Sequence, residues 1–264
     1  MISQKKQTKV FADTAEIKEI YNLLQNNVPI EGVTTNPTLL AKAFGDRKFT
    51  EQDLDKAYMD LLKEIRKILP DGSISGEIFV KPETKSEEIY KMASEMSDQV
   101  DRIHIKIPIF GEGLKAAGDF VKKGGRVNMT LCFSLDQARA VEEATMGATE
   151  EGQVYVSPFV GRLEKLGERG MSLIENIYTK FAIDKAHTKI LAASIRNLEQ
   201  LENCIAMGID LVTVPPAILN EWKEKGFRRL KNIPYIDNKD LNIDHQLTTE
   251  GFEAFVEARQ SLLK

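Results

Sequence analysis

Cysteine and histidine are scarce in this 264-residue sequence. The two cysteines, Cys132 and Cys204, lie in apolar surroundings without the spacing of a disulfide framework, so we expect them to be reduced and buried. The three histidines, His104, His187 and His245, lie far apart, and neither an HExxH nor a CxxC motif occurs. The sequence therefore predicts no metal site.

Long apolar runs and nucleotide-binding loops are also missing. No apolar run approaches the roughly 20 residues that a membrane-spanning helix needs, and the polar, basic segment Met1–Lys9 is unlike a secretory signal. Neither GxGxxG nor a GxxxxGKS or GxxxxGKT loop occurs. A net charge of −4 indicates no basic face for nucleic acid. We therefore expect a cytoplasmic protein that uses no cofactor and binds neither membranes nor nucleic acid.

What the sequence contains is a regular alternation of short β-branched runs with longer stretches of helical periodicity. The predicted strands are Lys9–Ala12, Gly32–Thr35, Ser73–Val80, Arg102–Pro108, Arg126–Leu131, Gln153–Phe159, Lys189–Ser194 and Asp210–Val214. The predicted helices are Ala15–Asn26, Glu51–Leu69, Thr84–Gln99, Gly111–Lys123, Ser134–Met146, Gly170–Lys185, Asn197–Met207 and Ala217–Lys225. This alternation is typical of an α/β fold, the closed (β/α)₈ or TIM barrel, with an open doubly wound sheet as the alternative.

We expect one barrel domain over residues 1–264, because no linker or low-complexity stretch interrupts the chain. Residues 227–264 break the alternation and form a C-terminal extension. Its helical arm carries Phe252, Phe255 and Val256 on one face, which must be buried against the barrel or against another subunit.

The fourth predicted strand carries a lysine, Lys106, near its end. Burial disfavours the protonated form of an amine, and a neutral amine in a shielded pocket is what Schiff-base chemistry with a ketone or aldehyde requires. The same lysine could instead pack its stem on apolar neighbours and hold its charged group in water. The strand by itself leaves both interpretations open.

Polar side chains follow seven of the predicted strands, at the end of the barrel where TIM-barrel enzymes carry out their chemistry. They are Asp13, Thr34, Thr35, Asn36, Glu77, Lys106, Asn128, Thr130, Ser157, Arg162, Ser194 and Arg196. Each of them alone could be a helix cap, a turn or an exposed ion pair. Their repetition at one end of the barrel favours a functional site.

These side chains divide into chemical roles. Asp13 and Glu77 are carboxylates available for proton transfer beside the amine of Lys106. Neutral side chains suit hydroxyl groups, and a cationic cluster suits a phosphate. The neutral set is Asn36, Asn128 and Ser157, and the cationic cluster is Arg162, Ser194 and Arg196. A polyhydroxylated ketose phosphate would use every role, whereas a metal-dependent aldolase would need histidine ligands that this sequence lacks.

Seven motifs spread over nearly the whole chain resemble the transaldolase family, particularly its short microbial members. They are FADTA (11–15), GVTTNPTL (32–39), SGE (75–77), IKIP (105–108), NMTLCFS (128–134), SPFVGR (157–162) and AASIRN (192–197). The resemblance implies a (β/α)₈ barrel and a Schiff base on Lys106. It also implies transfer of a dihydroxyacetone unit, in the pentose phosphate pathway, from sedoheptulose 7-phosphate or fructose 6-phosphate to glyceraldehyde 3-phosphate or erythrose 4-phosphate.

The resemblance further implies residue roles. Asp13 would handle the C4 hydroxyl proton during cleavage of the carbon–carbon bond, and Glu77 and Thr130 would hold a catalytic water. The remaining substrate-binding residues would be Asn36, Asn128 and Ser157 around the dihydroxyacetone unit, Arg162, Ser194 and Arg196 around the phosphate, and also Thr35 and Phe159. Related fructose-6-phosphate aldolases typically carry glutamine at the position of Glu77 and tyrosine at that of Phe159, so both positions resemble transaldolase.

Other interpretations stay open. A fructose-6-phosphate aldolase, a transaldolase for another ketose such as a sulfonated sugar, and a non-catalytic sugar-phosphate-binding barrel are alternatives. His104 should lie one barrel layer below Lys106, and we expect it to be buried and hydrogen-bonded without a chemical role. The C-terminal extension resembles an arm that packs on neighbours in ring-like oligomers, so we expect a homo-oligomer, a pentamer or a decamer. The segment 228–242 is longer than in the short members.

Overall fold

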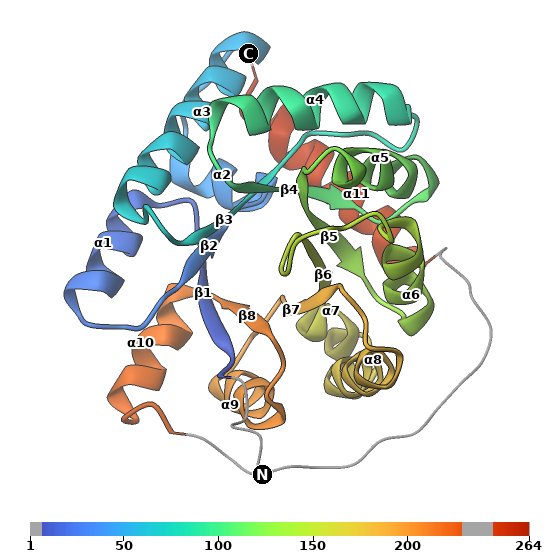
Figure 1. Cartoon of the computed structure of the whole chain (residues 1–264). Helices are drawn as coiled ribbons and strands as arrows, with labels where there is room; N and C mark the ends of the chain where they lie inside the picture. The colour runs from blue at the N-terminus through green and yellow to red at the C-terminus, as the bar shows by residue number, and fades with distance from the viewer. Residues whose placement is uncertain (1–6, 229–244, 264) are drawn as a thin grey trace.

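Eight parallel strands close into a barrel in the order β1 to β8, with β1 paired to β8. The computed structural model describes residues 7–228 and 245–263, so all but the first residue of the unusual segment 228–242 lies outside the described residues. Figure 1 shows the helices as a ring around the strands. The predicted α/β fold, a (β/α)₈ TIM barrel, is confirmed.

The strands are short and their bounds lie close to those predicted. They are β1 (Lys9–Asp13), β2 (Gly32–Thr34), β3 (Ser73–Glu77), β4 (Ile103–Pro108), β5 (Arg126–Cys132), β6 (Val154–Pro158), β7 (Lys189–Ala192) and β8 (Leu211–Val214). The ring of helices consists of α1 (Ile17–Gln25), α3 (Glu51–Ile68), α4 (Ser86–Gln99), α5 (Gly111–Lys122), α6 (Leu135–Ala144), α8 (Gly170–Asp184), α9 (Leu198–Met207) and α10 (Pro216–Glu224). Within the described ranges, no helix is long and apolar enough to cross a membrane.

Two strands, β3 and β7, end two or more residues earlier than predicted. β3 leaves the sheet after Glu77, where the Ile78 N–H donates a last hydrogen bond to the carbonyl of Lys106 at 3.2 Å. β7 ends at Ala192, and two residues later Ser194 has a left-handed backbone (φ 58°) that a strand does not continue. Both breaks place polar residues at the mouth of the barrel.

Three further helices are present: α2 (Pro37–Phe44), α7 (Val160–Lys165) and α11 (Gln246–Gln260). The first two were not predicted, and α11 was predicted only as a helical arm. The start of α2 has a local cause, because the Asn36 side chain accepts a hydrogen bond from the Leu39 N–H at 2.9 Å and Pro37 occupies the first helical position. The Asn-Pro pair is therefore a helix N-terminus.

Alternation along β4 separates the two layers of the core. Ile103, Ile105 and Ile107 are buried in the large apolar cluster between the strands and the helices. Lys106 is also buried, but on the other face of the strand. The opposite, N-terminal part of the barrel interior holds a separate apolar cluster of Phe11, Tyr155, Leu191 and Leu211. Polar side chains, including His104, Arg126 and Lys189, border a cavity at that end, whereas most of the predicted site residues lie at the C-terminal end.

His104 lies toward the N-terminal end of the barrel and borders the cavity there. Its ring stacks on Tyr155 at 4.0 Å, Nε2 lies 2.8 Å from the carbonyl of Gly152, and Nδ1 lies 3.3 Å from the Ser73 hydroxyl. Because a carbonyl can only accept, Nε2 carries the proton and Nδ1 accepts from Ser73. His104 is therefore buried and hydrogen-bonded, as predicted.

The last helix, α11 (red in Figure 1), crosses the C-terminal end of the barrel and contacts α2 and β5. The Thr248 hydroxyl donates to the carbonyl of Leu131 at 3.1 Å, and the ring of Phe252 packs edge-on against Phe110 at 5.0 Å. At its other end Arg259 forms an ion pair with Glu51 at 3.2 Å. Of the two predicted placements for the apolar face of the arm, the structure has it on its own barrel.

Candidate active site

A cavity of about 230 Å³, the mouth cavity, opens at the C-terminal end of the barrel. Most of the predicted site residues line it: Asp13, Asn36, Lys106, Asn128, Ser157, Phe159, Arg162, Ser194 and Arg196. The other three, Thr35, Glu77 and Thr130, lie behind its wall and are almost completely buried. The strand ends thus bring residues from seven strands of the barrel to one place.

Lys106 and Glu77 form a buried ion pair at the base of this site. Parallel pairing of β3 with β4 sets the two residues side by side, and Lys106 Nζ lies 2.9 Å from Glu77 Oε2. Their side chains are 5% and 1% exposed. Lys106 Nζ also donates to the carbonyl of Thr35 at 3.3 Å. The amine is held by two acceptors and is almost completely buried.

Burial raises the pKa of Glu77 to about 7, against the opposing effect of Lys106. The carboxyl group can therefore hold or release a proton near neutral pH. Apart from the ion pair with Lys106, it has no hydrogen-bond partner among the residues that the structure describes, and neither has the buried hydroxyl of Thr130. These polar groups are available to a reactant or a water.

Asp13 ends β1 and faces the same cavity. Its Oδ1 accepts a hydrogen bond from the Thr34 hydroxyl at 2.7 Å, and that hydroxyl lies 2.6 Å from the hydroxyl of Thr213 on β8. Since Thr34 donates to Asp13, Thr213 must donate to Thr34. Burial raises the pKa of Asp13, while Lys106, Thr34 and Arg196 lower it in part. A second carboxyl group of raised pKa thus belongs to the site, on the wall of the mouth cavity.

Asn128 is oriented by two serines. The Ser157 hydroxyl donates to Asn128 Oδ1 at 2.7 Å, and Asn128 Nδ2 donates to the Ser75 hydroxyl at 3.1 Å. All three are buried on β6, β5 and β3. The amide has one donor and one lone pair left for a substrate hydroxyl, as the predicted role requires.

Thr35 is connected outward rather than to the cavity. The Glu77 N–H donates to the Tyr58 hydroxyl at 2.8 Å, Tyr58 and Thr35 hydroxyls lie 2.7 Å apart, and Thr35 donates to the carbonyl of Ser75 at 3.1 Å. The proton order along this chain is fixed, because Thr35 donates its one hydroxyl proton to the Ser75 carbonyl and therefore accepts from Tyr58. A tyrosine from helix α3 thus holds the backbone of Glu77 and the side chain of Thr35.

The cationic cluster lies at the other side of the cavity. Arg162 packs between two aromatic rings, 5.3 Å from that of Phe159 and 5.9 Å from that of Phe255. Burial and the nearby Arg196 lower its pKa. Gly161 lets Arg196 lie close to Arg162, because a Cβ at position 161 would lie 2.3 Å from Arg196 Cγ. Two guanidinium groups held together in this way favour an anionic ligand.

Some site residues were not predicted. Tyr58, Ser75 and Thr213 complete the hydrogen-bond chains described above. Ser75 precedes Glu77 by two residues and so shares its strand face, a signal present in the sequence. Tyr58 lies on an outer helix, where nothing in its neighbourhood along the chain distinguishes it from a core residue. In the described part of the chain, no group of His, Cys, Asp and Glu is arranged to hold a metal ion.

Comparisons with known proteins identify a family that matches nearly the whole chain. Residues 10–264 match the family model described as Transaldolase/Fructose-6-phosphate aldolase. A probable transaldolase of Clostridium botulinum (strain Eklund 17B / Type B) is 36% identical over 97% of this chain and 100% of that protein. A probable transaldolase of Brucella ovis is 34% identical over 94% of each.

A likeness among solved structures concerns the fold alone. An enolase of the mandelate racemase subgroup from Agrobacterium tumefaciens superposes with a TM-score of 0.53, at 12% identity, over 85% of this chain and 57% of that one. At such identity a shared barrel says nothing of shared chemistry. The sequence matches, in contrast, span nearly the whole chain, including all of the predicted site residues. On the basis of these matches, the chain belongs to the transaldolase/fructose-6-phosphate aldolase family.

Proposed function

We propose that this protein is a transaldolase, which carries a dihydroxyacetone unit from a ketose phosphate to an aldose phosphate through a Schiff base on Lys106. The observation that carries the proposal is the buried pair of Lys106 and Glu77, 2.9 Å apart, in a site whose far side holds Arg162 and Arg196. A protein that only binds sugar phosphates has no need of a buried amine beside a carboxyl group of perturbed pKa.

The polar groups of the cavity suit the two halves of such a substrate. Arg162, Arg196 and Ser194 would bind the phosphate through charge-assisted hydrogen bonds. Asn128 and Ser157 would bind hydroxyl groups at the other end, near Lys106. A ketose held at both ends has its carbonyl carbon beside the amine, and this fixed approach supplies much of the rate gain of an intramolecular reaction.

Schiff-base formation would use Lys106 and Glu77. The neutral amine adds to the ketone carbon and gives a carbinolamine. The protonated carboxyl group of Glu77 then donates its proton to the new hydroxyl, the carbon–oxygen bond breaks, and water leaves with the former carbonyl oxygen. An iminium on Lys106 and a carboxylate on Glu77 remain, so charge and atoms balance.

Cleavage would use Asp13. Its carboxylate takes the proton of the C4 hydroxyl, the bond between C3 and C4 breaks, and the electron pair moves into the iminium to form an enamine. The aldose phosphate leaves. An incoming aldose phosphate is attacked by the enamine, Asp13 returns the proton, and addition of water to the new iminium frees the product and Lys106.

The decisive experiment is borohydride trapping in the presence of fructose 6-phosphate or sedoheptulose 7-phosphate. Mass spectrometry should find one reduced substrate adduct on Lys106, and Lys106→Met, which keeps the length of the stem, should carry none. Lys115→Ala, which changes an exposed lysine, serves as the control and should trap normally. An adduct that persists in Lys106→Met would rule out this mechanism.

The same assay separates the remaining interpretations. A transaldolase should stall after one equivalent of aldose phosphate unless an acceptor is supplied, whereas a fructose-6-phosphate aldolase would release dihydroxyacetone continuously. A panel that includes a sulfonated ketose tests the anion, since Arg162 and Arg196 suit phosphate and sulfonate alike.

A further inference from the structure

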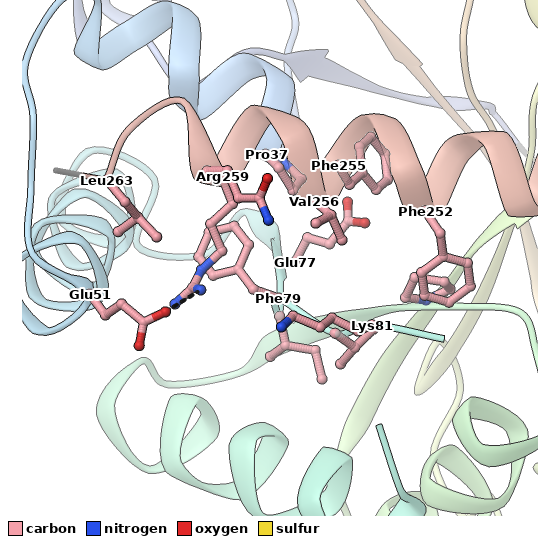
Figure 2. A pocket seen from close by; sticks show the side chains of 14 residues that line it. Pro37, Glu51, Glu77, Phe79, Lys81, Phe252, Phe255, Val256, Arg259 and Leu263 are labelled. Carbon is pink, nitrogen blue, oxygen red and sulfur yellow. Dashed lines mark hydrogen bonds and ion pairs between the residues drawn. The ribbon is translucent and has the colours of Figure 1, made fainter. Parts of the chain in front are cut away.

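A second cavity, of about 120 Å³, lies beneath α11 on the far side of Glu77 from the mouth cavity; we call it the rear cavity. Figure 2 shows it between the helix and the segment after β3, with the carboxylate of Glu77 directed toward α11. Its apolar wall includes Phe79, Phe252 and Val256, and Lys81, Arg259 and Gln260 supply polar groups.

The two cavities share a wall made of the reacting pair. Lys106 lines the mouth cavity and not the rear one, while Glu77 lines the rear cavity and not the mouth. Phe255 contributes to both and separates them. The ion pair of Lys106 with Glu77, 2.9 Å long, is therefore the polar connection from one cavity to the other.

Water suits the rear cavity. A cavity holds water when it is roomy and offers each molecule two to four polar partners, and one water occupies about 30 Å³ of liquid. The Glu77 carboxylate, with lone pairs that no described neighbour uses, is one such partner, and the side chains of Arg259 and Gln260 are others. Lys81 and Gln260 are exposed, so the chain of polar groups leads from Glu77 to solvent.

The proposed reaction needs such a passage. Every Schiff base formed on Lys106 releases one water beside Glu77, and every hydrolysis consumes one. During both steps a ketose phosphate occupies the mouth cavity, with its phosphate at Arg162 and Arg196. Water cannot pass through that side while the substrate fills it.

We propose that the rear cavity is a water site and passage through which Glu77 exchanges water and protons with solvent while substrate occupies the mouth cavity. The proposal rests on the proposed function, because it assigns the route of the water that Schiff-base chemistry on Lys106 releases. It adds a second entrance to the site, formed by α11.

The test fills the rear cavity with Val256→Phe. Enzyme and fructose 6-phosphate in ¹⁸O-water exchange the carbonyl oxygen once per cycle of imine formation and hydrolysis, which mass spectrometry of the sugar measures against an enzyme-free blank. The exchange rate and kcat should fall about tenfold or more, since well-placed proton transfer is worth about 10²-fold. KM should change less than about twofold, because the phosphate site is untouched.

Three controls make the result specific. Glu253→Phe adds the same ring on the exposed face of α11 and should exchange at the wild-type rate. Val256→Ala enlarges the cavity and should exchange at least as fast as wild type; if it is as slow as Val256→Phe, disturbed helix packing is the cause and the proposal fails. If Val256→Phe does not fold, Val256→Leu fills less of the rear cavity and should lower the ¹⁸O exchange rate and kcat by a smaller factor.

The failures of the two proposals are distinguishable. Wild-type enzyme without a borohydride adduct on Lys106 contradicts the proposed function. Normal trapping together with unchanged ¹⁸O exchange in folded Val256→Phe contradicts the rear passage alone.

Discussion

Burial shifts the pKa values of Glu77 and His104 in opposite directions for the same reason, which is that a low-dielectric interior disfavours charge. The pKa of the Glu77 acid rises to about 7, and the pKa of the His104 base falls to about 3. At neutral pH, His104 is therefore an uncharged filler of the barrel interior. Glu77, with the same degree of burial, is left close to half protonated and suited to proton transfer.

Replacing Glu77 by glutamine tests whether catalysis depends on the acidic proton of this side chain or only on its size. Glu77→Gln keeps the size of the side chain but cannot donate an acidic proton, so we expect kcat to fall by about 10²-fold or more. The wild-type rate of borohydride trapping should decline as pH rises through about 7, where Glu77 loses its proton. A pH profile of trapping should lack this inflection in the variant. An unchanged inflection would assign it to another group.

The lowered pKa of His104 predicts that the folded protein loses stability in acid. Its pKa is lower folded (about 3) than unfolded (6.5), so between these values the unfolded chain binds more protons. The stability that neutral His104 provides is complete above pH 6.5 and is lost as pH falls. Relative to His104→Gln, the wild type should lose about 1.4 kcal/mol per pH unit below 6.5. Urea unfolding at pH 7, 6 and 5 measures the difference, and parallel curves for both proteins would contradict it.

At the scale of single residues, strand alternation was enough to predict most of the site. Asp13 and Lys106 were found because they lie near strand ends, and Asn128 because it shares a strand face with Thr130; the structure places all three at the mouth cavity. The outward connection of Thr35 through Tyr58 could not be predicted, since it depends on which turn of α3 lies behind β3. Sequence patterns specify the face of a residue and not its partner on another element.

Among the elements, α11 has the largest effect on the site besides the strands. A Cβ on Gly251 would lie 2.8 Å from Arg162 Nη1 and 2.7 Å from a methyl group of Leu131. The lack of a side chain at this helical position is therefore what lets the helix lie against the guanidinium group. Phe255, one turn later, covers the same group.

Gly251→Ala should weaken the anion site without unfolding the helix. Alanine favours a helix interior over glycine by about 1 kcal/mol, but its methyl group must displace Arg162. We expect KM for the phosphorylated donor to rise about tenfold, equivalent to about 1.4 kcal/mol, with little change for the unphosphorylated sugar. Steady-state kinetics with both sugars measure this ratio.

The matched control is Glu253→Ala, two residues away on the exposed face of α11. It changes helix propensity and leaves Arg162 undisturbed, so KM should stay at the wild-type value. Equal effects on phosphorylated and unphosphorylated sugars in Gly251→Ala would contradict the assignment to Arg162.

Long helices were predicted with better accuracy than short ones. The eight strands and the ring helices follow the periodicity of the sequence, but α2 and α7 do not, because eight and six residues are too few to establish a helical period. The position of α11 was open between the barrel and a neighbouring subunit, since an amphipathic face specifies burial and not the surface that buries it.

For the whole molecule, the N-terminal end of the barrel bears the stability and the C-terminal end the chemistry. Phe11 is fully buried among Tyr155, Leu191 and Leu211, and β1 closes the barrel by pairing with β8. Phe11→Ala should destabilise the protein by about 3–5 kcal/mol, whereas Met146→Ala, at an exposed side chain, should change stability by less than about 0.5 kcal/mol. Urea unfolding of both variants tests this division, and equal stabilities would contradict it.

The predicted homo-oligomer, a pentamer or a decamer, stays a prediction. Light scattering coupled to size-exclusion chromatography measures it directly. A monomer at micromolar concentration would show that α11 needs no second chain to stay buried.

The position of α11 also bears on how the protein matures during synthesis. The ribosome releases the chain from its N-terminus, and β1 to β8 end at Val214, well before α11 starts at Gln246. All eight strands are therefore translated before the helix that covers Arg162 and the rear of Glu77. The site is complete only after α11 has left the ribosome, so synthesis itself delays catalysis.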